Sequence, residues 1–202
     1  MDKFMEAAIE ESETGFHEGG IPIGAVLVHH DRIIGRGRNR RVQRGSVVFH
    51  GEMDALENAG RQPASVYREC TLYTTQSPCP MCAGAILLYG IPRVVVGENQ
   101  TFMGAEDLLR SKGVAVEVFQ DPRCVDLMSR FVTASPGVWN EDIGLSSMTG
   151  QEFRAIVVSS SFAAVIVVTF SGKIARPRGS SERAISTASS QGHRTRIGFS
   201  AS

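Results

Sequence analysis

The first 144 residues carry two hydrophobic periodicities, one typical of helices and one typical of strands. The helical period is clearest over residues 2–18, where glycines follow the pattern and one side is apolar: Phe4, Met5, Ala8, Ile9 and Phe16. Similar patterns with glycine or proline at their ends predict further helices over 50–60, 79–90, 106–113 and 123–134, and a short helix or turn over 135–144.

Between these segments lie short runs of β-branched and apolar residues. Residues 24–30 and 32–38 read as a β-hairpin, with His30 and Asp31 between its strands. Further strands are predicted over 71–75, 93–98 and 114–119. Because strands alternate with helices along the chain, we expect a three-layer α/β/α sandwich with a mixed, partly parallel central sheet.

The pattern changes after Gly144. Residues 156–170 are apolar but contain four Ser or Thr, and they are too few for the ~20 apolar residues that span a bilayer. Residues 179–202 are rich in serine without periodicity, so disorder is predicted. We therefore expect a domain over 1–147 and an atypical extension over 148–202. The extension either adds strands to a sheet edge or is a read-through or mis-spliced segment without a role.

Composition and charge narrow the partners. The chain has 202 residues, 42% hydrophobic and 21% charged, which suits one compact soluble domain with an appendage. Its net charge is zero, but residues from 173 onward carry six Lys or Arg and one Glu. The preceding part is therefore net −5, which gives no reason to expect nucleic acid or a membrane as partner.

Cysteine usage and the N-terminus indicate the cell compartment. Four cysteines are too few for a disulfide scaffold in a chain of this length. The first twelve residues are acidic and lack the apolar run of a secretory signal. An intracellular, reducing setting is expected, in the cytoplasm with the nucleus as a second location.

The stretch SPCPMC contains the first chemical signal. Cys79 and Cys82 are three apart at the start of a predicted helix, so both sulfurs can reach one ion. His50, at the start of the preceding helix, is the expected third ligand. Three protein ligands leave one tetrahedral position open, as in catalytic zinc sites. In the alternative, Cys70 or Cys124 closes the site and makes it structural.

Glu52 follows His50 by two residues. This spacing places the Glu52 carboxylate near the metal but in a different direction from the His50 imidazole. The carboxylate is therefore suited to contact the metal-bound water rather than the metal. Zinc lowers the pKa of its water to roughly 7, and a nearby carboxylate can then take and deliver that proton. Taken alone, Glu52 would instead be a solvated helix residue.

These residues form the signature H-x-E followed by P-C-x-x-C of the zinc deaminases. Further stretches, among them GGIPIGAVLV, GRGRN and WNEDIG, make residues 3–144 resemble the fungal-type cytosine deaminases. The resemblance implies the cytidine deaminase-like fold, one catalytic Zn²⁺ per subunit and a homodimer. It also implies hydrolysis of free cytosine to uracil and ammonia in pyrimidine salvage. A (β/α)₈ barrel of ~250 residues, as in unrelated bacterial cytosine deaminases, would not fit this length.

The resemblance also implies roles for individual residues. Asn39, helped by the Gly51 backbone N–H, is expected to bind the O2/N1 edge of the pyrimidine. Glu52 is expected to carry protons to N3 and then to the leaving amine, and Asp142 to read the exocyclic amino group. On spacing alone, the alternative is that Asn39 is a turn residue.

The remaining implied residues are apolar or small. Phe102 and Trp139 are expected to cover the ring face, although without the resemblance they could be ordinary core aromatics. The pocket lining is expected to include Ile23, Thr74 and Ser77. Two features depart from the family: Asn140 stands where an aromatic residue is usual, and 58 residues follow Gly144.

Three alternatives stay open. A nucleoside or a base within nucleic acid could be the substrate, and a cluster of arginines near Asn39 gives this some weight: Arg36, Arg38, Arg40, Arg41 and Arg44. A catalytically dead, zinc-stabilised binding module would keep the ligands but would not need Glu52.

The helix over 79–90 is apolar on almost every side, which favours a subunit contact over a buried monomeric helix.

Overall fold

The computed structural model describes residues 2–145, 155–160 and 163–168, which fall into two compact units, Met1–Ser147 and Met148–Ser202. The first unit is built on a five-stranded sheet in the order β2-β1-β3-β4-β5. Its strands are β1 (Gly24–His29), β2 (Arg32–Arg38), β3 (Cys70–Gln76), β4 (Arg93–Glu98) and β5 (Ala115–Val118). Strand β1 is antiparallel to both of its neighbours, whereas β3, β4 and β5 are parallel to one another.

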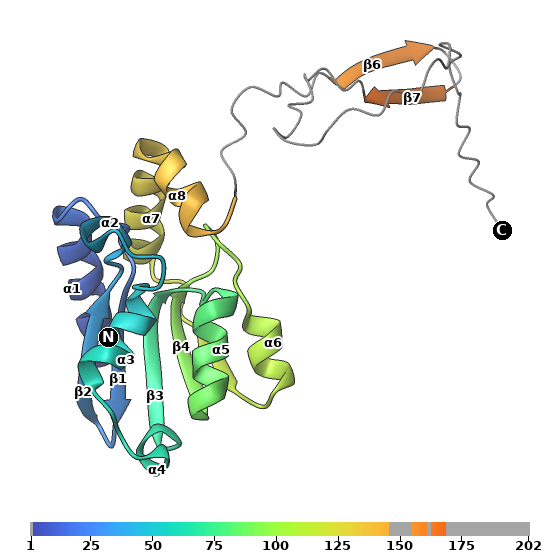
Figure 1. Ribbon diagram of the computed structural model, residues 1–202. Coiled ribbons are helices and arrows are strands. Elements are labelled where there is room, and N and C mark those ends of the chain that lie inside the picture. The colour runs from blue at the N-terminus through green and yellow to red at the C-terminus, as the bar shows by residue number, and fades with distance from the viewer. Residues whose placement is uncertain (1, 146–154, 161–162, 169–202) are drawn as a thin grey trace, which may run out of the picture. The chain divides into compact units, whose positions relative to one another are not determined.

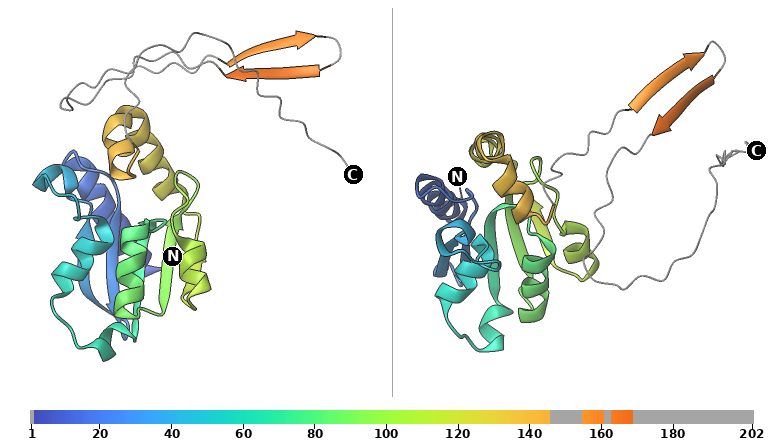
Figure 2. Two further views of the ribbon diagram at one scale, coloured as in Figure 1. Left: turned by 45° about the vertical axis from the view of Figure 1, so that its right-hand side comes forward. Right: turned by 45° about the horizontal axis from the view of Figure 1, so that its top comes forward.

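Helices cover both faces of this sheet (Figures 1 and 2). Helices α1 (Lys3–His17) and α7 (Pro122–Ala134) pack on one face. The other face carries α3 (Gly51–Ala59), α5 (Pro80–Tyr89) and α6 (Glu106–Ser111). The predicted three-layer α/β/α sandwich with a mixed sheet is therefore confirmed.

Side chains alternate between the two faces along the central strands. Leu72 of β3 and Val94 of β4 join the core beneath α3, α5 and α6. Their neighbours Tyr73 and Val95 join the core beneath α1 and α7. This alternation follows from the two-residue period of a strand, and it gives the sheet two buried faces.

Local sequence signals explain most element ends. The Asp2 side chain accepts hydrogen bonds from the backbone N–H of Phe4 and Met5 and so caps α1. In the β1–β2 hairpin, His30 and Asp31 both have positive φ, 44° and 59°, as a tight two-residue turn requires. Helix α5 begins at Pro80 and ends before Gly90, which adopts the left-handed conformation.

Three short helices complete the first unit. The predicted element over 135–144 is α8 (Pro136–Asp142), which follows α7. Helices α2 (Arg41–Arg44) and α4 (Ala64–Tyr67) were not predicted. Each of these two has only four residues, which is about one helical turn and too short to show an apolar period.

The second unit contains one described element pair. Strands β6 (Ala155–Ser160) and β7 (Ala163–Val168) pair antiparallel in a two-stranded sheet. The disorder predicted for 179–202 lies outside the described residues. Among the residues that the structure describes, no helix has the length and apolar character needed to cross a membrane.

Candidate active site

The three expected metal ligands meet at the carboxyl end of β3. His50 is the N-cap of α3, and Cys79 is the N-cap of α5, so two helix N-termini point at one spot. Cys82 lies one turn further along α5 and is buried. The ligand atoms of these three residues lie within 4.8 Å of one another. The helix N-termini favour negative charge and hence thiolate ligands.

The donor set fits a tetrahedral zinc ion. Bonds of about 2.3 Å to sulfur and about 2.05 Å to nitrogen, at the tetrahedral angle, place the two ligand atoms about 3.6 Å apart. The observed distance between Cys79 Sγ and His50 Nδ1 is 3.5 Å. Within the described residues, no fourth His, Cys or carboxylate joins this group. The arrangement therefore matches an open three-ligand site.

The two thiols of the pair differ in acidity. A hydrogen bond from Cys82 lowers the pKa of Cys79 to about 4, against the opposing effect of burial and with help from His50. The same hydrogen bond and burial raise the pKa of Cys82. Burial lowers the pKa of His50, but its contact with Cys79 and the charge of Asp142 outweigh this and raise it overall. One thiolate is thus favoured by the protein alone.

Cys70 and Cys124 lie away from this site. Cys70 begins β3 and donates a hydrogen bond to the Val66 carbonyl oxygen, and burial raises its pKa to about 11. Cys124 is buried in α7, and burial raises its pKa to about 12. Neither thiol joins the cluster of ligand atoms.

Glu52 lies in the first turn of α3 with only 3% of its surface exposed. The Cys82 thiol donates to its Oε2 at 3.4 Å. Burial, followed by the negative charge of Cys79, raises the pKa of Glu52 above its usual value. A carboxyl group with a raised pKa beside a metal site can both accept and release a proton.

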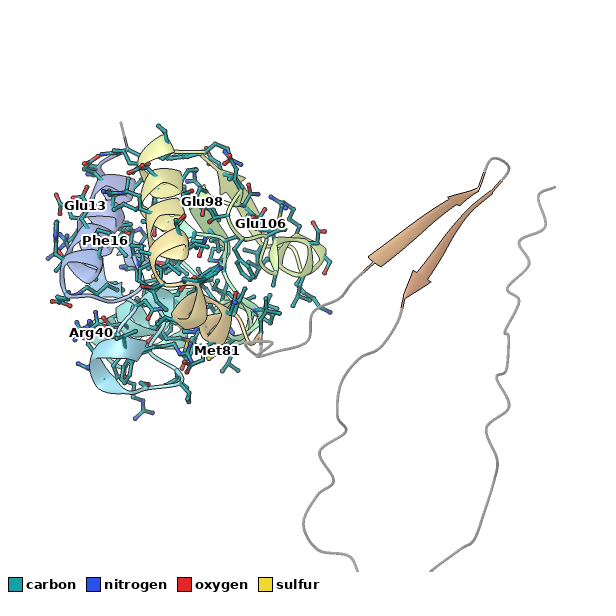
Figure 3. All side chains as sticks on the ribbon, turned by 90° about the horizontal axis from the view of Figure 1, so that it is seen from above. Glu13, Phe16, Arg40, Met81, Glu98 and Glu106 are labelled. Carbon is teal, nitrogen blue, oxygen red and sulfur yellow. The ribbon has the colours of Figure 1, made fainter. Side chains whose placement is uncertain are left out.

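A small cavity opens beside these residues. Its lining includes the expected Ile23, Ser77, Phe102, Trp139 and Asp142, together with His50, Glu52 and Cys79. Two further lining residues, Gln76 and Ile143, were not predicted. The rings of Phe102 and Trp139 pack edge to face, with centroids 5.8 Å apart. Viewed from above, α8 lies across this end of the domain (Figure 3).

Asp142 is the centre of a polar network. Its Oδ1 accepts a hydrogen bond from Arg41 Nη1 at 2.7 Å and one from Asn39 Nδ2 at 3.3 Å. It also lies 3.7 Å from His50 Nε2. Asn39 is fully buried, and its Oδ1 accepts a hydrogen bond from the Arg41 backbone N–H. This is the geometry of a turn residue, the alternative role that the sequence offered for Asn39. One asparagine thus shapes the turn and contacts Asp142.

Two buried carboxylates bind side chains that line the cavity. Gln76 donates to Glu98 at 2.9 Å and to the Thr101 hydroxyl. The Ser77 hydroxyl donates to Glu106 at 2.8 Å and accepts from the backbone N–H of Gly104. Both carboxylates are essentially unexposed, at 0% for Glu98 and 1% for Glu106. These contacts fix Gln76 and Ser77, whose side chains line the cavity.

Thr74, Gly51 and Asn39 do not line the cavity. The Thr74 hydroxyl donates to the Gln76 carbonyl oxygen of its own strand, so it turns away from the cavity. Gly51 begins α3, where a Cβ atom would lie 2.8 Å from the Ile23 carbonyl oxygen. Gly51 therefore permits close packing of the helix start against Ile23.

Sequence comparisons identify relatives for the first unit. The family described as "Cytidine and deoxycytidylate deaminase zinc-binding region" matches residues 1–98. A cytosine deaminase of Candida albicans is 51% identical over 143 residues, which cover 70% of this chain and 95% of that protein. A tRNA-specific adenosine deaminase of Streptococcus pyogenes is 42% identical over 108 residues, which cover 52% of this chain and 67% of the relative.

Solved structures show the same fold. A structure from a study of tRNA:A34 deaminases is 28% identical, with a TM-score of 0.53, and covers 62% of this chain and 98% of that one. A guanine deaminase from Nitrosomonas europaea, 22% identical with a TM-score of 0.51, covers 64% and 83% and bears on the fold alone. From the 51% identity across nearly all of one relative and from the His-Cys-Cys site, the chain belongs to the fungal-type cytosine deaminases of the zinc-dependent cytidine deaminase-like superfamily.

Proposed function

We propose that this protein hydrolyses free cytosine to uracil and ammonia, a reaction of pyrimidine salvage. The observation that carries the proposal is the convergence of Glu52 and Asp142 on one small, aromatic-walled cavity beside the His50, Cys79 and Cys82 cluster. In this reaction water adds its oxygen to C4 of the ring, the C4–N4 bond breaks, and the amine leaves as ammonia. The 51% identity to a cytosine deaminase supports this substrate.

The cluster would hold the zinc ion through His50 Nδ1 and the two cysteine sulfurs. Zinc bound there would supply a water molecule acidic enough to lose its proton near neutral pH. Glu52 is placed to accept a proton at its carboxyl group, because burial raises its pKa. It then delivers protons to N3 of the ring and to the leaving amine.

The cavity walls orient the base. Asp142 accepts from the exocyclic amine. Asn39 and the Gly51 backbone N–H do not line the cavity, and their proposed binding of the O2/N1 edge rests on the family resemblance. Phe102 and Trp139 cover the ring face, which suits a flat base without an attached sugar. Arg41 positions Asp142 through its 2.7 Å ion pair, although the motif did not single Arg41 out for this.

Replacing Asp142 with alanine is expected to lower kcat/KM for cytosine by about 10- to 100-fold, because a buried charge-assisted hydrogen bond to the substrate is lost. Zinc content should not change. The matched control is Glu141→Ala, since Glu141 is the adjacent residue and its side chain is 78% exposed. Steady-state kinetics with zinc analysis measures both. Equal kinetics in the two variants would mean that Asp142 does not contact the substrate.

Four of the five arginines in the cluster are ion-paired within the protein, and Arg44 lies over the Phe49 ring, which does not favour nucleic acid. Arg36 and Arg38 make ion pairs with carboxylates of α1 or its C-cap: Glu10, Glu11 and Glu18. Arg40 pairs with the buried Asp54 at 3.0 Å, and Arg41 pairs with Asp142. These guanidinium groups are engaged in holding the fold rather than free to contact phosphates.

Ammonia release from three substrates tests the proposed function. The substrates are cytosine, cytidine and an adenine-containing hairpin RNA, each offered at equal concentration. We expect turnover of cytosine well above the other two. Preferential turnover of cytidine or RNA would assign a nucleoside or a nucleic acid as substrate. A zinc-loaded protein that deaminates none of them would be a binding module.

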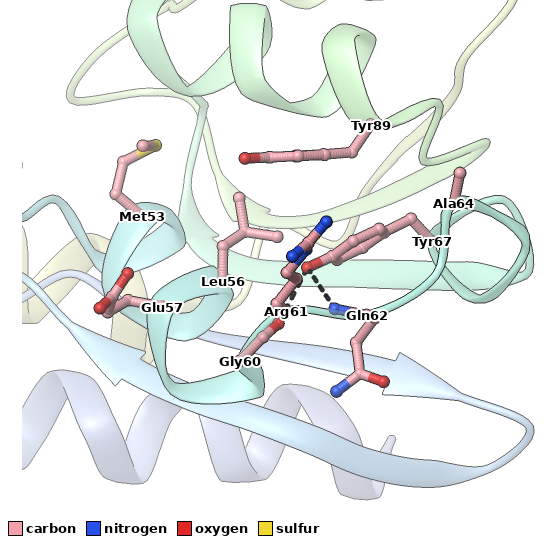
Figure 4. A pocket seen from close by; sticks show the side chains of 9 residues that line it. All are labelled: Met53, Leu56, Glu57, Gly60, Arg61, Gln62, Ala64, Tyr67 and Tyr89. Carbon is pink, nitrogen blue, oxygen red and sulfur yellow. Dashed lines mark hydrogen bonds between the residues drawn. The ribbon is translucent and has the colours of Figure 1, made fainter.

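We further propose a homodimer formed through the outer face of α5. Two large apolar side chains of this helix are exposed, Leu88 by 79% and Tyr89 by 40%. Tyr89 also lines a hollow of about 680 Å³, in which it stacks on Tyr67 with ring centroids 4.8 Å apart (Figure 4). An exposed leucine next to a tyrosine that lines a hollow suits a second copy of the chain.

Substituting Leu88 with glutamate is expected to weaken the dimer by roughly 100-fold or more, because each copy would bury a charge in place of leucine at a two-fold interface. Leu108→Glu is the matched control, since Leu108 is 43% exposed on α6. Sedimentation velocity over a concentration series gives the dissociation constants. A dimer of unchanged affinity in Leu88→Glu would place the interface elsewhere.

We propose that residues 1–147 form the complete deaminase and that 148–202 have no part in catalysis. The support is the position of every described site residue within the first unit. A chain ending at Ser147 is expected to keep its zinc, its dimer and kcat/KM within about twofold of full length. Loss of activity or dimer on truncation would assign the extension to the working protein.

We also propose that the protein is located in the cytoplasm and in the nucleus, because its four cysteines are free thiols.

A further inference from the structure

A second cluster of potential ligands lies at the tip of the β1–β2 hairpin. Strand β1 ends at His29, and His30 begins the turn. The register pairs His29 with Cys70 of β3, which brings the adjacent Glu69 to the hairpin tip. Consecutive residues of a strand normally point to opposite faces, but the positive φ of His30 brings the two imidazoles together. Their ring centroids are 4.0 Å apart.

The two rings converge on one carboxylate oxygen. Glu69 Oε2 lies 3.2 Å from His29 Nε2 and 2.9 Å from His30 Nε2. The three ligand atoms all lie within 4.8 Å of one another. Nitrogen and oxygen ligands at about 2.05 Å from a tetrahedral ion are about 3.3 Å apart. Glu69 Oε2 is within about 0.4 Å of this separation from each imidazole nitrogen, and the two nitrogens lie no more than 4.8 Å apart.

We propose that His29, His30 and Glu69 form a second metal site, which binds a divalent transition-metal ion such as zinc. Two imidazoles and one carboxylate suit zinc and its neighbours, whereas calcium and magnesium prefer oxygen ligands throughout. The side chains are 23%, 69% and 54% exposed, so an ion can enter from solvent and complete its shell with water. The site binds more weakly than the buried cysteine cluster, because it has no thiolate.

The second site is separate from the catalytic cluster. It lies where β3 begins at Cys70, whereas the catalytic cluster lies beyond the end of this strand at Gln76. Seven residues of strand place the two ends of β3 roughly 20 Å apart. Metal at the hairpin tip therefore ties β1 to the start of β3 without touching the cavity, and it leaves turnover unchanged.

Zinc titration of the full-length holoprotein tests the proposal. After dialysis leaves one tightly held equivalent, calorimetric titration with zinc is expected to show a second, weaker equivalent, whereas titration with calcium shows none. The thermal midpoint should rise with added zinc. His30→Ala and Glu69→Gln should each lose the second equivalent and the zinc-dependent rise, while keeping the first equivalent and cytosine turnover.

Two histidines outside the cluster serve as controls. His17→Ala, on α1, and His193→Ala, in the extension, should both keep the second equivalent. Absence of a second equivalent in the unaltered protein would overturn the proposal. So would its survival in both His30→Ala and Glu69→Gln, or its loss in either control, because the ion would then bind elsewhere.

Discussion

Glu52→Gln is expected to lower kcat for cytosine by at least ~10²–10⁴-fold, the range typical of general acid–base catalysis. The upper end applies here, because one carboxyl group serves more than one proton transfer in the proposed reaction. Glutamine keeps the size and burial of the side chain but cannot exchange a proton. Folding and zinc content should therefore be retained, as checked by thermal unfolding and metal analysis.

The matched control for this substitution is Glu13→Gln, which removes an exposed carboxylate from α1. Its kinetics should equal those of the unaltered protein. Single-turnover measurements separate the chemical step from substrate binding, and only the chemical step should be slowed in Glu52→Gln. Turnover within tenfold of the unaltered protein would remove Glu52 from the proton path.

Removing a metal ligand is expected to have the second large effect. His50→Ala and Cys82→Ser should each weaken zinc binding by more than roughly 100-fold. Mutating a residue that only hydrogen-bonds to a metal ligand typically costs up to roughly 100-fold, and losing the ligand itself should cost more. Because a bound metal stabilises the folded state, the same variants should unfold at lower temperature. Zinc per chain after dialysis, and thermal unfolding with and without chelator, measure the two effects together.

Cys70→Ser and Cys124→Ser provide the controls for these ligand variants. Both thiols are buried, so a serine at either place will lower stability through packing alone. Neither change should alter the zinc content, because neither sulfur joins the ligand cluster. Loss of zinc in either control would indicate a closed, structural site and would contradict the catalytic assignment.

The fold could be predicted from sequence wherever a segment carried its own signals. Proline and glycine at the ends of an apolar run predicted α5 between Pro80 and Gly90. Apolar, β-branched strands on either side of His30 and Asp31 predicted the β1–β2 hairpin. Helices α2 and α4 escaped notice because one turn of helix has no period to detect. Their formation depends on the surrounding chain rather than on local pattern.

Some residues of the candidate site could likewise be predicted from the sequence, and others could not. The ligand cluster and Glu52 were predictable because their spacing is local and their chemistry is restrictive. Gln76 and Arg41 were missed, since their roles arise from contacts with Glu98 and Asp142, which only the folded chain brings near. Thr74 was expected in the lining, but a hydrogen bond within β3 turns its hydroxyl elsewhere.

The position of α8 after every metal ligand has a consequence for synthesis. The ligands are complete once Cys82 has left the ribosome, whereas Trp139 and Asp142 emerge some sixty residues later. A nascent chain can therefore bind its metal ion before α8 is synthesised. At that stage the cavity still lacks the wall that contains Trp139 and Asp142. The order of residues along the chain therefore allows metal loading to precede formation of this cavity wall.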